Sequence, residues 1–212
     1  MSSNRFISRT LATGVAILVM IGLVMSALHY AMPSYNPGFK RYPTATILHI
    51  VPGALYLGLA PLQFMRFVRE KWIHIHRALG WALSVCAMLV GTTAFFMAMI
   101  FPFSGVAESI SVGFFASLFL CAIVKGLVKI RAKEVIPHKE WMTRAFALGL
   151  GIATSRIIFL PFYFSMANPK QAQVQVLFIA SFIAGFSVHL LATELWIRRA
   201  RRKRRAFESK RS

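Results

Sequence analysis

The sequence predicts an all-α membrane protein, a bundle of six transmembrane helices with both termini on the cytoplasmic side. Three observations predict this fold class. Hydrophobic residues make up 57% of the chain and charged residues only 15%, whereas soluble domains have about 45–50% and about 25%. Six apolar stretches reach the roughly 20 residues that a membrane-spanning helix needs. Lys and Arg residues gather on one side of these stretches, as they do in membrane proteins.

The six predicted spans are joined by short connections, so we expect one helical bundle over residues 1–212 without a soluble domain. The first span follows basic residues, as the apolar part of a signal peptide does. Its apolar run is long, however, and no small-residue cleavage site follows, so we predict an uncleaved helix. In chain order, the predicted spans are about 11–30, 45–65, 78–101, 108–128, 141–164 and 174–197.

The basic residues predict the orientation of these spans. With the N-terminus inside, 21 of the 25 Lys and Arg residues fall on the cytoplasmic side, Arg5 and Arg9 among them. Only Lys40, Arg41 and Lys170 fall outside, and Arg156 lies within a span. Because every loop follows the positive-inside rule, we expect both termini in the cytoplasm. Four tryptophans fall near the predicted inner boundary, where an aromatic belt is expected: Trp72, Trp81, Trp141 and Trp196.

The basic tail at 198–212 carries much of the net charge of +19. A cluster of this kind after a last span attracts anionic lipid, at about 1 kcal/mol per basic residue near the surface. Nucleic-acid binding is the alternative, but the tail lacks interleaved aromatic residues and a folded module to present it. We therefore expect the lipid bilayer, with anionic lipid at the tail, as the partner, and no nucleic acid. A homo-oligomer or a partner membrane subunit is a further candidate.

Polar residues of the second span share one helical face. His49, Gly53, Tyr56, Ala60 and Gln63 recur at steps of four and three residues, which is the period of an α-helix. Ionisable groups inside a membrane are costly and mark functional sites. We expect this face to point into the bundle.

The third and fourth spans contain the two cysteines, Cys86 and Cys121, inside apolar runs and without a CxxC spacing. We expect both to be small packing residues. The fifth span carries Arg156, about 25 Å from His138 along the helix and near the depth of His49. A lone arginine in lipid costs at least about 2.5 kcal/mol and needs a partner. An acidic ligand group is one candidate partner, and backbone carbonyls freed by Pro161 are the other.

Histidines recur at the predicted inner level. His76 lies at the head of the third span, His138 at the head of the fifth, and His189 with Glu194 low in the sixth. Three such histidines on three helices could converge, and imidazole binds haem iron and relays protons near neutrality. We interpret His29 and His74 as ordinary interfacial residues.

Motifs of several enzyme classes are missing. The chain has no HExxH, no GxSxG, no Walker A loop and no aspartate, which argues against hydrolases. The six Asp and Glu residues are too few and scattered for a carboxylate-bridged metal site. We therefore predict no metal site of that kind.

Two segments carry a resemblance to a known family: "LHIVPGALYLGLAPLQFMRFVREKWIHIHRALGW" and "HKEWMTRAFALGLGIATSRIIFLPF". With them the chain resembles the bacterial membrane proteins grouped as domain of unknown function 2306. The resemblance covers the second to fifth spans and implies a multi-pass protein of the bacterial inner (plasma) membrane. The residues that carry it are His49 with Gly53, Gly58, Gln63, Arg66, His76-Arg77, Gly80, His138, Trp141-Met142, Arg144 and Arg156.

A weaker likeness is to four-helix b-type cytochromes of the cytochrome b561 group. That likeness implies haem between histidines on facing helices, at matched depth. The inner level can supply such a pair, His76 with His138 or His189, whereas the outer level has only His49 and His29. At most one haem site is therefore expected.

Three functions remain open on the sequence. The first is a redox protein with one b-type haem, or a quinone, held by His76 and His138, and with Arg144 pairing a propionate. The second is an anion carrier or channel with a polar cavity lined by His49, Tyr56, Gln63 and Arg156. The third is a non-catalytic membrane assembly subunit. Haem b is the candidate cofactor, and we place the redox function first.

Overall fold

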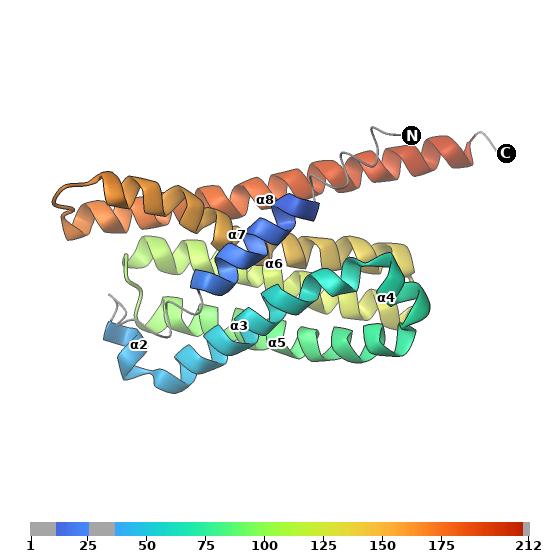
Figure 1. Cartoon of the computed structure of the whole chain (residues 1–212), viewed down its shortest axis with the longest axis horizontal. Helices are drawn as coiled ribbons and strands as arrows, with labels where there is room; N and C mark the ends of the chain where they lie inside the picture. The colour runs from blue at the N-terminus through green and yellow to red at the C-terminus, as the bar shows by residue number, and fades with distance from the viewer. Residues whose placement is uncertain (1–11, 26–36, 210–212) are drawn as a thin grey trace.

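The computed structural model describes residues 12–25 and 37–209, and all regular structure in these ranges is helical. Arg5, Arg9 and His29 lie outside the described residues. Figure 1 shows a first helix, five long helices and two short helical turns. The helices are Ala12–Met25, α2 (Pro37–Arg41), α3 (Pro43–Phe64), α4 (Arg66–Lys71), α5 (Ile73–Ile100), α6 (Val106–Arg131), α7 (Val135–Ser165) and α8 (Gln171–Glu208).

Five helices, α3 and α5 to α8, are long and apolar enough to cross a membrane. They confirm the second to sixth predicted spans as helices. The helix Ala12–Met25 is shorter, about 21 Å at 1.5 Å per residue, against a hydrocarbon core of about 30 Å. A sixth span and the cytoplasmic orientation of both termini therefore stay predictions.

The long helices form an antiparallel bundle. α3 packs on α5, α5 on α6, and α6 on α7, while a smaller contact between α7 and α3 closes the ring. α8 packs along α7 outside this ring (Figure 1). The first helix crosses the bundle near the meeting of α3 and α7, since a Cβ on Gly22 would touch Leu57 and Ala153.

The two ends of the bundle are named here by their short helices. The α4 end carries Arg66–Lys71 and the connection between α6 and α7, and the sequence predicts it to be cytoplasmic. The α2 end carries the connections at 101–105 and 166–170. α5 and α7 both begin at the α4 end, because α6, the one helix between them, runs antiparallel to both (Figure 1). Side chains in their first turns therefore share one level.

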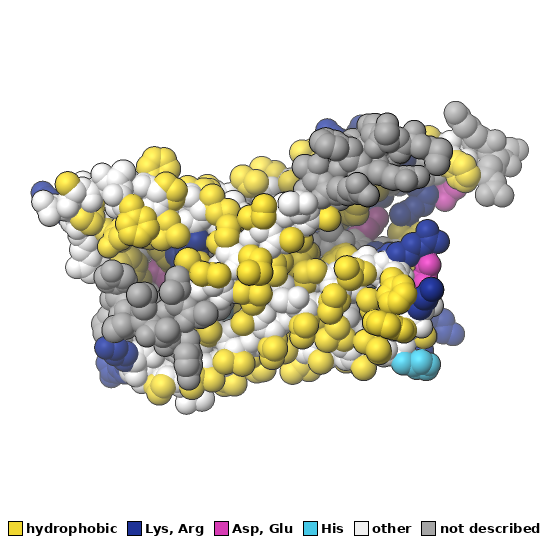
Figure 2. Space-filling model, viewed as in Figure 1, with side chains coloured by type: hydrophobic (Ala, Val, Ile, Leu, Met, Phe, Trp, Pro, Cys, Tyr) yellow, Lys and Arg dark blue, Asp and Glu magenta, His cyan; other side chains and the backbone are white. Residues whose placement is uncertain are grey.

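Small residues and stacked aromatics fill the centre of the bundle. Ala87, Ala145 and Ala153 are fully inaccessible to solvent, which lets the helices approach closely, as small residues do in membranes. The Phe182 and Phe186 rings stack at 4.3 Å between centroids. Large apolar side chains cover much of the outer surface (Figure 2). In a bilayer this surface would face the lipid chains.

The bends between helices use unusual backbone where the chain turns most sharply. Gly105, just before α6, has φ +66°, and Lys133, between α6 and α7, has φ +61°. Only glycine adopts such values without strain, so the turn at Lys133 is held by the flanking helices. The Lys129 ammonium bonds Glu134 across this turn at 2.9 and 3.0 Å.

Candidate functional site

His76 and His138 both lie at the α4 end of the bundle. His76 lies in the first turn of α5 and His138 in the first turn of α7, and their imidazoles are within electrostatic reach of each other. The pairing follows from topology, because alternate helices of an antiparallel bundle begin at the same end. The structure thus brings together two of the three predicted inner histidines.

A backbone carbonyl holds the His138 ring. The His138 Nδ1 lies 2.8 Å from the carbonyl oxygen of Gly126 in α6. A carbonyl only accepts hydrogen bonds, so Nδ1 carries the proton and Nε2 keeps its lone pair. Metal-binding histidines are oriented in this way, by a bond from the nitrogen that does not bind the metal. The lack of a side chain at Gly126 leaves room for Met142, because a Cβ there would collide with the Met142 side chain.

The His76 side chain has a polar atom without a partner. Its Nδ1 is buried and makes no hydrogen bond to any described residue. Buried nitrogens are nearly always bonded, so each exception needs an explanation. Arg69, Arg77 and Lys139 also lie within electrostatic reach of His76. The pair of imidazoles therefore lies in a positively charged environment at the bundle end.

Arg144 has a protein partner in α8, and its predicted role of pairing a haem propionate stays a prediction. Its Nε and Nη2 donate to the two carboxylate oxygens of Glu194 in α8 at 2.5 and 3.1 Å. The guanidinium also stacks over the Trp141 ring, 4.5 Å from its centroid. The fork uses Nε and Nη2 only, and the buried Nη1 has no partner among the described residues.

His189 lies away from the other two inner histidines, so the predicted convergence of three is wrong. Its Nε2 is 2.7 Å from the Thr154 hydroxyl of α7. Thr154 follows His138 by 16 residues, or about 24 Å along the helix. His189 therefore cannot share a ligand with His138.

The polar face of α3 points into the bundle, but its members contact different neighbours. The His49 Nδ1 lies 3.2 Å from the Val90 carbonyl and 3.1 Å from the Thr93 hydroxyl, both in α5. Tyr56 is buried, with its ring edge-on to Phe119 at 5.6 Å. The buried Nε2 of Gln63 has no partner among the described residues.

Gln63 lies beside α5, where its Oε1 is 3.4 Å from the position of a Cβ on Gly80. Gln63 is near the α4 end of α3, whereas His49 is near the α2 end, 14 residues away. A surface hollow of about 550 Å³ near His49 is lined by its partner Thr93, by Thr92 and by Arg41, Tyr42, Pro43, Thr44, Ala45, Leu48 and Phe96. None of the four predicted cavity residues lines this hollow.

Arg156 lies where the α2 ends of α6, α7 and α8 meet. Its Cζ is 5.3 Å from the centre of the Phe178 ring, which is a cation–π distance. Glu108 is near enough to attract it, but its carboxylate accepts the Ser104 N–H at 2.7 Å. Among the described residues the guanidinium has neither an ion pair nor a hydrogen bond. Basic and acidic side chains are visible within the apolar surface at this end (Figure 2).

Replacing Arg156 by methionine is expected to raise the free energy of unfolding by about 1–2 kcal/mol. Insertion of a lone arginine costs at least about 2.5 kcal/mol, and the contact with Phe178 offsets about 0.5–1 kcal/mol of it. Thermal unfolding of the purified protein in detergent, without added anions, measures the change. Arg66→Met at the exposed pair Arg66–Glu70 is the control and should change stability little. A loss of stability in Arg156→Met would contradict the expectation and would indicate a bound acidic group.

Two contributors to these sites were not predicted from the sequence: the Gly126 carbonyl and the Thr93 hydroxyl, which orient histidines. Glu108, the one carboxylate that the sequence offers near Arg156, lies within electrostatic reach of it. A backbone carbonyl has no signal in the sequence at all.

Comparisons with known proteins agree with a membrane bundle. The model of the family described as predicted membrane protein (DUF2306) matches residues 46–197, which is more than two thirds of the 212 residues. The matched region runs from α3 to the end of the apolar part of α8 and contains both His76 and His138. No curated protein and no solved structure matches the chain.

Proposed function

The chain belongs to this family of predicted membrane proteins, and from its histidine pair we propose that it is a redox protein of the bacterial inner membrane. In this proposal six spans place both termini in the cytoplasm, and the α4 end faces the cytoplasm. His76 and His138 hold one b-type haem there. A single observation carries the proposal: the Gly126 carbonyl holds the His138 ring through Nδ1, at the level of a buried His76 Nδ1 that has no partner among the described residues.

The residues around the pair fit a haem. His76 and His138, on helices at opposite corners of a four-helix ring, would hold the haem iron through their imidazoles. The Gly126 carbonyl fixes the tautomer and the orientation of the His138 ring. Arg69 and Arg77 supply the positive charge that two propionates need, in the place first assigned to Arg144. A bound haem would carry one electron at a time.

A quinone is the second candidate for the same pair. The His76 imidazole can donate a hydrogen bond to a quinone carbonyl oxygen, and its buried Nδ1, which has no partner among the described residues, favours a ligand of either kind. The carrier hypothesis has less support, because His49, Tyr56, Gln63 and Arg156 contact separate neighbours. Electron transfer also needs a donor and an acceptor, so a homo-oligomer or a partner membrane subunit remains part of the proposal.

The absorption spectrum of the protein, purified from haem-replete cells, tests the haem. We expect a Soret band that shifts on reduction with dithionite. His76→Ala and His138→Ala should each abolish the band or convert it to a form with one protein ligand. His49→Ala and His189→Ala are matched controls, since each removes a histidine bonded elsewhere.

Three outcomes would contradict the haem. One is a protein without a Soret band even after titration with haemin. Another is an equal loss of the Soret band in all four histidine variants, provided that each variant still elutes as the folded protein. The third is a band that all four variants keep. If no haem binds, extraction and chromatography of co-purified quinone test the second candidate on the same variants.

A further inference from the structure

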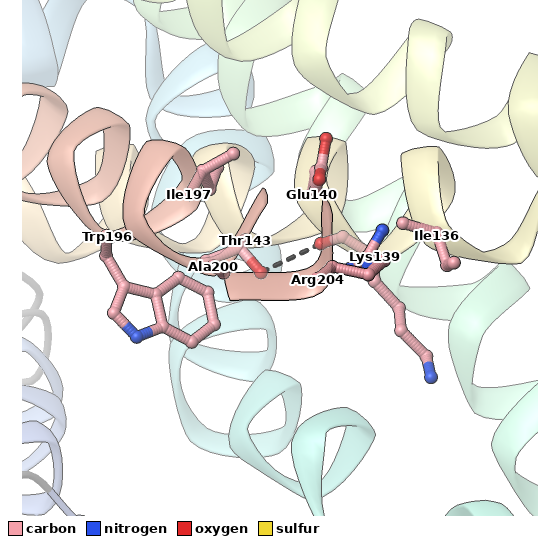
Figure 3. Close-up of a pocket in the computed structure, with 8 residues that line it drawn as sticks. All are labelled: Ile136, Lys139, Glu140, Thr143, Trp196, Ile197, Ala200 and Arg204. Atoms are coloured by element: carbon pink, nitrogen blue, oxygen red, sulfur yellow. Dashed lines mark hydrogen bonds between the residues drawn. The ribbon is translucent and has the colours of Figure 1, made fainter. Parts of the chain in front are cut away.

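A hollow of about 180 Å³ opens between α7 and α8 at the α4 end. Figure 3 shows that both helices line it, with Trp196 at one end and Ile136 at the other. The lining residues are Ile136, Lys139, Glu140, Thr143, Trp196, Ile197, Ala200 and Arg204. The hollow is separate from the histidine pair, and α8 forms it by continuing as a helix past the predicted span to Glu208.

The lining is apolar along one part and basic along the other. Ile197 is 1% exposed and forms a buried floor, whereas Ile136 and Trp196 present 44% and 57% of their area to the surroundings. Lys139 and Arg204 supply positive charge. An apolar groove with a basic rim is complementary to a molecule that has an acyl chain and an anionic head.

The one acidic residue of the lining is already neutralised. Both carboxylate oxygens of Glu140 accept hydrogen bonds from the Arg201 guanidinium. The Thr143 hydroxyl donates to the Lys139 carbonyl at 2.8 Å, within α7. The charges of Lys139 and Arg204 are therefore left for a ligand. The pair between Glu140 and Arg201 also ties the extension of α8 to α7, which holds the hollow open.

The hollow lies at the level of the lipid headgroups. Exposed tryptophans lie at the level of the lipid headgroups, and Trp196 is such a residue. Arg204 follows it by eight residues, or about 12 Å along α8. The interfacial layer is about 5–8 Å thick on each side, and a long arginine side chain can reach back into it. A phosphate at this level is within reach of Arg204.

We propose that this hollow binds one anionic phospholipid. Its phosphate lies between Lys139 and Arg204, and one acyl chain lies against Trp196 and the Ile197 floor. The basic tail alone would attract anionic lipid without a fixed position, whereas the hollow gives one molecule a defined place between two helices. The proposal does not depend on the function of the histidine pair.

Binding of phosphatidylglycerol to the full chain, in detergent micelles and by native mass spectrometry, tests the site. The test variant is Lys139→Gln with Arg204→Gln. The matched control is Arg199→Gln with Arg202→Gln, which removes the same charge from exposed residues of α8 outside the lining. We expect the test variant to bind about tenfold or more weakly, and the control to change two- to threefold at most. Both variants alter exposed side chains, and size-exclusion chromatography checks that they fold.

Several outcomes would overturn the proposal. Equal weakening in both variants would mean a diffuse basic surface without a site. Equal binding of phosphatidylcholine by the unaltered chain would mean that the anionic charge is not recognised. Inorganic phosphate that displaces the lipid at matched ionic strength would mean a phosphate site without a role for the acyl chain. A short RNA duplex that displaces it under the same conditions would mean that the tail binds nucleic acid.

Discussion

Replacing Glu194 by leucine is expected to lower the free energy of unfolding by about 2–4 kcal/mol. The Arg144 guanidinium, whose side chain is only 11% exposed, pairs with Glu194 through both carboxylate oxygens. Removing one partner of a buried pair leaves an uncompensated charge and costs about 3–5 kcal/mol. Glu194 is 32% exposed, so water would lower that cost somewhat. Thermal or denaturant unfolding in detergent measures the loss.

Two further variants make this result specific to the pair. Glu70→Leu removes the acidic partner of Arg66, but these side chains are 58% and 82% exposed, so its effect should stay below about 1 kcal/mol. The double variant Arg144→Met, Glu194→Leu replaces the pair by apolar side chains and should recover most of the lost stability. Together with Arg144→Met alone it closes a double-mutant cycle, which yields the coupling energy. If Glu194→Leu is as mild as Glu70→Leu, the pair does not hold α7 and α8 together.

The sequence predicts the helices of this fold well because hydropathy and length decide them. The five long helices lie where the apolar stretches are, and they differ mainly at their ends. α7 begins at Val135, ahead of the predicted 141, and α8 continues to Glu208, past the predicted 197. Hydropathy reports the apolar part of a helix, whereas Ala, Arg and Lys are strong helix formers in water as well. The charged ends therefore stay helical without any apolar signal.

The common level of His76 and His138 was also predictable, because helix heads on the same side of a bundle lie at one level. The error at His189 has a physical cause. α8 ends at Glu208, 19 residues past His189, which is about 28 Å along the helix. His189 therefore lies well inside the bundle, where it bonds Thr154. The predicted span ends at 197, which places His189 too near the α4 end.

The role of Arg144 could not be predicted from the sequence for a different reason. Glu194 lies 50 residues further along the chain, and nothing in either segment says that α7 and α8 bring the two together. That contact depends on how closely the two helices approach, which depends in turn on a few small residues. α8 approaches α7 closely at Gly185, where a Cβ would lie 2.8 Å from the carbonyl oxygen of Gly151.

Replacing Gly185 by alanine is therefore expected to destabilise the protein by about 1–3 kcal/mol. The new Cβ would lie 2.7 Å from the Ser155 nitrogen and 3.0 Å from its Cα. These are backbone atoms of α7, which cannot move aside as the end of a flexible side chain can, so α8 must shift outward. The shift would stretch the contact of His189 with Thr154, now 2.7 Å, and would loosen the pair of Arg144 with Glu194.

Gly113→Ala is the matched control, since it adds the same methyl group to a helical glycine of α6. Its Cβ would meet only the ends of the Phe95 and Met99 side chains, at 3.6 and 3.7 Å, which is ordinary van der Waals contact. We expect no loss of stability there, because alanine favours the helix over glycine by up to about 1 kcal/mol. The melting temperatures of the two variants in the same detergent give the comparison. Equal melting temperatures would show that α7 and α8 are further apart than the structure places them, and the hollow beside Trp196 would then lose its second wall.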